Sequence, residues 1–106
     1  PPVLVRELIA GRREILLLKK SFDVFTNPSA EAVLETLDPS EVVVFGVATD
    51  VCDHAAIVGL LRRGRRVAFV EDASRGLDEE RTRARLAQWR EAGVRFTTSE
   101  AVASRV

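Results

Sequence analysis

The chain has 106 residues, enough for one domain with a modest hydrophobic core. Its 16 basic and 16 acidic side chains balance, and no apolar run approaches the roughly 18 residues of a membrane span, so no nucleic-acid or membrane partner is expected. The lone cysteine excludes an internal disulfide and, with a single histidine, argues against a zinc site. We therefore expect a cytoplasmic protein without metal or cofactor.

The first part of the chain predicts a short helix over residues 3–10 and a buried strand over residues 15–18. This strand ends at Lys19 and Lys20. The chain contains no methionine and begins with proline, from which we expect a fragment or a processed chain.

Residues 21–28 predict a loop in which Phe22 and Phe25 pack. Asn27 predicts a helix N-cap, because the proline after it suits the first helical position. The helix that follows is expected to end at Asp38, which precedes a second proline.

The central stretch is expected to carry the functional site. Residues 42–45 are valines and phenylalanine, which predict a strand buried on both faces. Residues 46–49 predict a turn, and an apolar run from Cys52 to Leu61 predicts a helix that a basic pair and Gly64 end. Cys52 is therefore expected at the carboxyl end of a strand and the start of a helix, where open α/β sheets place their active sites.

The remainder predicts a strand, a loop, a helix and a short strand, over residues 66–71, 72–76, 78–92 and 94–97. Ser99 is expected to cap a terminal helix. Because strands alternate with helices, parallel pairing with right-handed crossovers is expected. We thus predict a single α/β domain over residues 1–106.

Two interpretations of Cys52 follow from the sequence. A helix N-terminus and an ammonium group from Lys19 or Lys20 would favour the thiolate, and backbone N–H groups near Ala48 and Cys52 would hold an oxyanion. Alternatively, a lone cysteine behaves as a small buried hydrophobe, and lysines at strand ends are commonly solvated.

The neighbours of Cys52 favour structural roles. His54 lies two residues further on and points to another side of the helix, so a surface or packing role is preferred over that of a base. Asp50 and Asp53 flank the helix start, where capping is expected. A charged Asp53 would also raise the pKa of the cysteine.

Three motifs in order resemble the isochorismatase-like cysteine hydrolases, which include nicotinamidase-related amidohydrolases. They are a lysine spaced from a phenylalanine (Lys19 to Phe25), the segment GVATDVC ending at Cys52, and the segment VEDA around Asp72. The resemblance implies a three-layer α-β-α, Rossmann-like fold with a mostly parallel sheet. It also implies hydrolysis of C–N bonds in small amides or related substrates.

The same resemblance implies roles for individual residues. Cys52 would attack a carbonyl carbon, and Lys19, with Lys20 as runner-up, would help to ionise it. A cis peptide bond between Val47 and Ala48 would aim backbone N–H groups at the oxyanion. Two further residues would contact the substrate, Phe25 and Thr49.

The family also has an aspartate on its first strand, and this chain is expected to begin after that strand. The substitutes to consider are Asp23, Asp50, Asp53 and Asp72, the last of which is expected to hold its own loop. A second hypothesis is therefore a catalytically inactive remnant that acts as a structural partner subunit. An exposed sheet edge favours a homo-oligomer under either hypothesis, and a small-molecule substrate is expected under the first.

Overall fold

The computed structural model describes residue 17 and residues 19–104. The chain forms two compact units, Pro1–Pro39 and Ser40–Val106, and each is described by itself. The predicted helix over residues 3–10 lies outside the described residues, as does the predicted strand over 15–18 apart from Leu17. No helix in the described part is long and apolar enough to cross a membrane.

The first unit contains a short 3-10 helix, η1 (Val24–Thr26), followed by helix α2 (Pro28–Leu37). Asn27 caps α2 as predicted, since its Oδ1 accepts the N–H of Ser29 at 2.9 Å. Asp38 ends the helix with a left-handed φ of 42°. Phe22 does not pack, because 66% of it is exposed.

The second unit is a parallel sheet with helices between its strands, which confirms the predicted α/β class. Its strands β1 (Val42–Val47), β2 (Val67–Arg75) and β3 (Arg95–Thr97) pair in that order, both pairs parallel. After β1 come η2 (Thr49–Asp53) and α3 (His54–Arg62), while α4 (Glu79–Glu91) joins β2 to β3 and α5 (Ser99–Ala103) follows β3.

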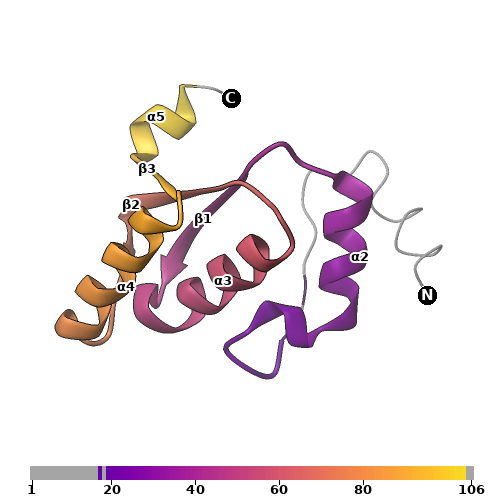
Figure 1. The fold of residues 1–106 in the computed structure, drawn as a ribbon, viewed down its shortest axis with the longest axis horizontal. Coiled ribbons are helices and arrows are strands. Elements are labelled where there is room, and N and C mark those ends of the chain that lie inside the picture. Colours follow the sequence, from indigo (N-terminus) through magenta and orange to yellow (C-terminus); the bar gives the residue numbers. More distant parts are fainter. Residues whose placement is uncertain (1–16, 18, 105–106) are drawn as a thin grey trace. The chain divides into compact units, whose positions relative to one another are not determined.

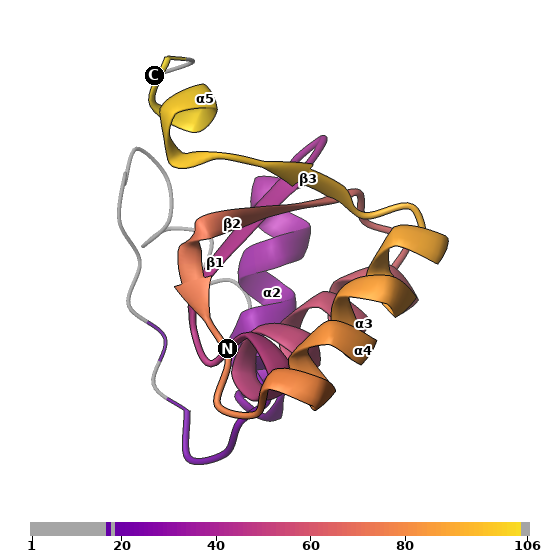
Figure 2. The ribbon, with the colours of Figure 1, turned by 90° about the vertical axis from the view of Figure 1, so that its left-hand side faces the viewer.

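Helices α3 and α4 lie side by side against one face of the sheet (Figures 1 and 2). Right-handed crossovers in a sheet whose strands follow chain order carry both helices to the same face. In β1, exposed and half-buried residues alternate, and the exposed ones are Val43, Phe45 and Val47. The prediction that both faces of this strand are buried is therefore wrong.

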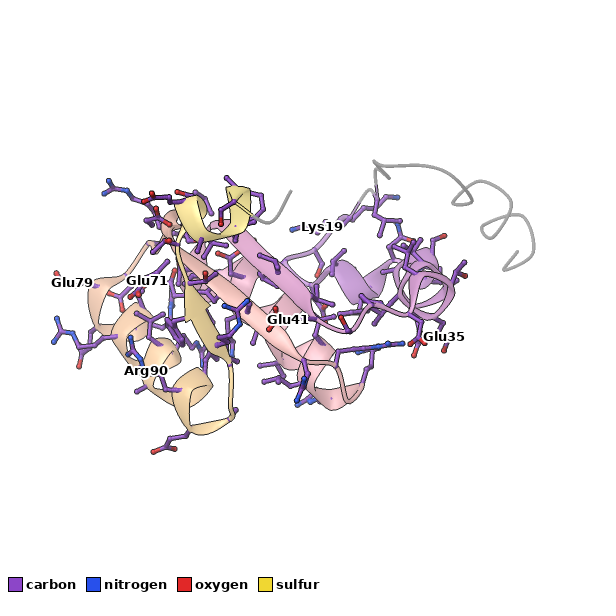
Figure 3. The ribbon with its side chains drawn as sticks, turned by 90° about the horizontal axis from the view of Figure 1, so that it is seen from above. Lys19, Glu35, Glu41, Glu71, Glu79 and Arg90 are labelled. Atoms are coloured by element: carbon purple, nitrogen blue, oxygen red, sulfur yellow. The ribbon has the colours of Figure 1, made fainter. Side chains whose placement is uncertain are left out.

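The core of the second unit is an aromatic cluster between β2, β3 and α4. Phe69 is almost fully buried and meets Trp89 edge to face, with ring centroids 4.9 Å apart. Phe96 meets the ring of Phe69 edge to face, with ring centroids 5.8 Å apart. Arg90 covers Phe96 with its guanidinium group and lies 4.0 Å from Glu71, both labelled in Figure 3.

Strand β2 continues to Arg75, so the loop predicted over residues 72–76 is wrong. The side chain of Ser74 supports the extension, because its hydroxyl donates to the carbonyl of Val70 and accepts the N–H of Gly46 at 3.1 Å. The pairing with β1 shifts register between Val44 and Gly46. The sequence pattern that predicts this strand is its run of apolar residues. The polar residues that continue β2 to Arg75 lack that pattern, so they were not recognised as strand.

The ends of the last two helices depend on capping side chains. Asp78 caps α4, since its carboxylate accepts the N–H of Arg81 at 2.8 Å. Thr98 caps α5 through its hydroxyl, so the prediction that Ser99 is the cap is wrong by one residue. Ser99 is the first residue of α5 instead.

Candidate functional site

Cys52 lies on a wide turn between β1 and α3. The peptide bond between Val47 and Ala48, just before this turn, is cis. The Ala48 carbonyl accepts the N–H of Val51 at 3.2 Å and that of Asp53 at 3.0 Å, and the second bond spans five residues, as in a π-helix. The α-helix begins only at His54, so the prediction that it starts at Cys52 is wrong by two residues.

The turn is anchored in the protein while its thiol-bearing residue is not enclosed. Ala48 and Thr49 are buried, as are Asp50 and Asp53. Cys52 is only half-buried. The second unit thus brings together four predicted site residues at the carboxyl end of β1: Val47, Ala48, Thr49 and Cys52.

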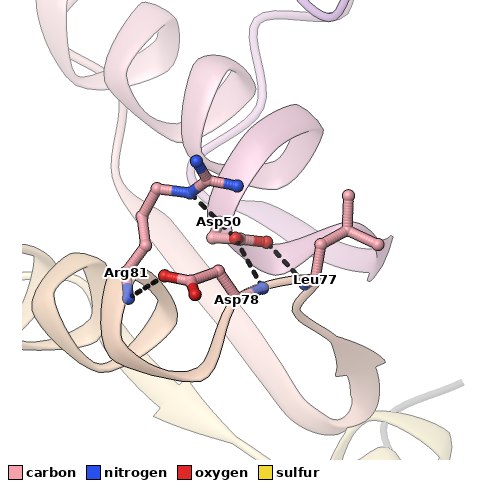
Figure 4. Close-up of polar contacts among 4 residues, drawn as sticks. All are labelled: Asp50, Leu77, Asp78 and Arg81. Atoms are coloured by element: carbon pink, nitrogen blue, oxygen red, sulfur yellow. Dashed lines mark hydrogen bonds and ion pairs between the residues drawn. The ribbon is translucent and has the colours of Figure 1, made fainter.

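Asp50 connects this turn to the loop before α4 (Figure 4). Its carboxylate is fully buried and accepts the N–H of Leu77 at 2.8 Å, the N–H of Asp78 at 3.1 Å and Nε–H of Arg81 at 2.9 Å. The Leu77 N–H contributes most to lowering the pKa of Asp50 to about 2, and the other two donors act in the same direction against burial. The expectation that Asp50 caps its own helix is wrong, because its bonds go to another element.

Asp53 lies beside Cys52 but does not cap α3 either. The residue is buried, and no described residue bonds to its Oδ2. Burial raises the pKa of Asp53 to about 6. A Cβ on Gly46 would lie 3.8 Å from its Oδ1, so the carboxyl group lies against the end of β1.

His54 has a structural role, which confirms the preferred interpretation of the sequence. Its Nδ1 accepts the indole N–H of Trp89 at 3.0 Å, and the two rings stack with centroids 5.9 Å apart. Burial, and next the positive charge of Arg85, lower the pKa of His54. The Nδ1 lone pair is occupied, so it cannot take the thiol proton.

The first unit holds the predicted activating lysine and the pocket phenylalanine. Lys19, labelled in Figure 3, donates from Nζ to the carbonyls of Ser21 and Phe22 at 3.1 and 3.4 Å. It also lines a cavity of about 330 Å³ whose other residues are Lys20, Ser21, Thr26, Asn27 and Pro28. Phe25 is half-buried in the same unit. The roles of Lys19 and Phe25 beside Cys52 stay predictions.

Two of the other aspartates act at helix starts. Asp23 accepts the N–H of Phe25 at 2.9 Å and caps η1. Asp72 accepts both the N–H of Ser99 at 2.8 Å and its hydroxyl at 2.7 Å. The hydroxyl and then the N–H lower the pKa of Asp72. Asp72 therefore holds the start of α5, and the expectation that it holds its own loop is wrong.

Sequence reasoning missed the links from α4 to the cysteine turn. Arg81 lies three residues after an aspartate N-cap, which marks a helix start, but nothing local pairs it with Asp50. Nothing local in the sequence signals that the single tryptophan, Trp89, donates a hydrogen bond to His54. Within residues 17 and 19–104, no group of three or more potential ligands could hold a metal ion.

Comparison with protein families identifies the family of this chain. Residues 2–101 match the Isochorismatase domain family. The chain belongs to the isochorismatase family. This confirms the relationship that the lysine, cysteine and aspartate motifs predicted, and the described sheet agrees with it.

Solved isochorismatase-like structures share this fold. An isochorismatase-like hydrolase from Alkaliphilus metalliredigens aligns over 90% of this chain and 52% of its own, with 19% identity and a TM-score of 0.75. PnC1 from L. infantum, in complex with nicotinate, aligns over 76% and 43%, with 27% identity and a TM-score of 0.70. YcaC from Pseudomonas aeruginosa, with hexane-2,5-diol and covalent acrylamide, aligns over 79% and 42%, with 26% identity and a TM-score of 0.68.

This isochorismatase-family chain spans about half the length of the structures that it matches. No curated protein matches it.

Proposed function

We propose that this isochorismatase-family chain carries the nucleophile of a hydrolase that cleaves C–N bonds in small amides or related substrates, with Cys52 as the nucleophile. The observation that carries the proposal is the placement of Cys52, half-buried on an anchored turn that follows a cis peptide bond at the end of β1. This is the edge at which parallel α/β sheets bind ligands. Family membership supports the same chemistry.

The reaction begins with the Cys52 thiolate. Its sulfur forms a bond to the carbonyl carbon, and the carbonyl electron pair moves to oxygen. Backbone N–H groups at Ala48 and Cys52 would donate to that oxyanion. When the carbonyl re-forms, the C–N bond breaks and the nitrogen leaves with the proton that the thiol gave up. Water then hydrolyses the thioester, its oxygen going to the acid and one of its protons to the sulfur, which restores the thiol.

Lys19 is proposed to favour the thiolate through its positive charge. Phe25 and Thr49 are proposed to contact the substrate. Two relatives are consistent with the proposal. One is in complex with nicotinate, a carboxylate of the kind that hydrolysis of an amide produces. The other carries covalent acrylamide, a compound that bonds to nucleophiles.

The test combines thiol alkylation with turnover. At pH 7, iodoacetamide should alkylate Cys52 faster in the unsubstituted protein than in Lys19→Ala, because the lysine charge favours the thiolate. Lys20→Ala, one residue further on, should leave the alkylation rate of the unsubstituted protein unchanged. Hydrolysis of a panel of amides should disappear in Cys52→Ala. An alkylation rate that Lys19→Ala leaves unchanged, together with turnover that survives Cys52→Ala, would contradict the proposal.

The second candidate is a non-catalytic subunit of an oligomer. It is favoured by the exposed side chains of Val43, Phe45 and Val47 along one face of β1. Apolar side chains gathered on one face are typical of protein contacts. Light scattering at micromolar concentration should then show an oligomer that Phe45→Glu dissociates, and a monomer would contradict this candidate.

A further inference from the structure

We propose that Asp50 is a positioning residue, whose buried carboxylate ties the turn that presents the Cys52 thiol to the loop and first turn of α4. The inference rests on the proposed function of Cys52. Asp50 lies two residues before Cys52 within the same π-helical turn. Its partners lie 27 to 31 residues further along the chain, so the link is tertiary.

The carboxylate is matched to its site. Two backbone N–H groups and one guanidinium N–H converge on its two oxygens, at 2.8 to 3.1 Å. The side chain has no exposed surface. An asparagine would offer one acceptor oxygen and would turn an NH₂ group towards a donor, leaving a buried N–H without an acceptor.

The loop can reach Asp50 because a glycine precedes it. A Cβ at Gly76 would overlap the side chain of Thr82 on α4. Only a residue without a side chain lets the chain run this close to the helix, with the N–H groups of Leu77 and Asp78 facing Asp50.

A second bond ties the other side of the cysteine to the same helix. His54, two residues after Cys52, accepts the indole N–H of Trp89 from α4. Cys52 therefore lies midway between two residues that are both bonded to α4. Loss of the Asp50 bonds would leave the turn bonded to α4 through His54, so the half of the turn before Cys52 would be held less firmly.

The test uses Asp50→Asn, with Asp72→Asn as the matched control. Both replace an aspartate that accepts hydrogen bonds from the start of a helix, but Asp72 serves α5. Both variants should lower the Tm. Only Asp50→Asn should also change Cys52, with alkylation at pH 7 about tenfold slower, a changed limiting rate at high pH and a lower kcat on any amide that is turned over.

A lower Tm with an unchanged alkylation profile in Asp50→Asn would overturn the proposal, and so would an equal change in Asp72→Asn. If Asp50→Asn does not fold, Arg81→Gln removes one donor through a side chain that is 47% exposed, and it should shift the profile in the same direction by less. A Cys52 alkylation rate that Lys19→Ala leaves unchanged would count against the proposed function alone. The limiting rate would still decide the role of Asp50.

Discussion

Trp89 donates its indole N–H to Nδ1 of His54 at 3.0 Å, and the two rings stack at 5.9 Å. The bond joins α4 to the first residue of α3. It requires a neutral imidazole with its proton on Nε2, because a protonated histidine has no acceptor. The bond therefore responds to pH beside the turn that carries Cys52.

The first prediction concerns this bond. Because the folded protein lowers the pKa of His54, the stability that it contributes is fully present above the unfolded pKa of about 6.5 and is lost as pH falls through the lower folded value. Trp89 is the only tryptophan, so its fluorescence should change in that range. His54→Gln keeps an acceptor but cannot titrate, and it should abolish the change. The same transition in His54→Gln would contradict the assignment.

Asp53 should act on stability in the opposite direction. Burial raises its pKa from 3.8 to about 6, so the folded state favours the protonated carboxyl. That contribution is fully present below about pH 4 and is lost as pH rises through about 6. Asp53→Asn mimics the neutral form, and it should be more stable than the unsubstituted protein at pH 8 by about 1–3 kcal/mol. At pH 4 the two should be similar.

Urea unfolding at pH 4 and pH 8 measures this difference. The comparison with the variant removes the effect of Asp50, whose lowered pKa contributes stability above about pH 4 that is lost as pH falls towards about 2. A variant that is less stable than the unsubstituted protein at pH 8 would show that the ionised carboxylate is stabilised instead.

The aromatic core should be sensitive to truncation. Phe69 is 1% exposed and contacts the rings of Trp89 and Phe96, so Phe69→Ala removes contacts on two sides and leaves a cavity. We expect it to lower the free energy of unfolding by about 3–5 kcal/mol. Leu77→Ala is the control, because that side chain is 74% exposed and should change stability little. Denaturant unfolding of both variants measures the two losses of stability. Equal losses would contradict the assignment of Phe69 to the core.

A paired contact between Glu41 and Arg95 should stabilise the sheet modestly. The guanidinium group donates from Nε at 3.1 Å and from Nη2 at 2.8 Å to the two carboxylate oxygens, and the pair raises the pKa of Arg95. A double-mutant cycle with alanine at both positions should give a small favourable coupling, because exposed ion pairs contribute little. The coupling should shrink in 1 M salt, because that ionic strength screens exposed charges. A coupling near zero at low salt would contradict a stabilising role for this pair.

Much of the fold is predictable because its signals are local. The cap at Asn27, the strand that starts at Val42 and the helix that Asp78 introduces all depend on a few adjacent residues. Prediction was wrong where the result depends on neighbours in space. The clearest case is β1. Its exposed side chains are apolar, as in a strand that is buried on both faces, so the sequence alone does not show that one face is exposed.

The candidate site divides in the same way. The sequence by itself determined that Cys52 follows a strand and precedes a helix, and its motifs identified the isochorismatase family, because apolar patterning and motif spacing are local properties. Only the tertiary structure decided the bonds of Asp50, His54 and Asp72, whose partners lie 27 to 35 residues away. A hydrogen bond requires atoms within about 3 Å, and no local pattern shows which distant residues the fold brings that close.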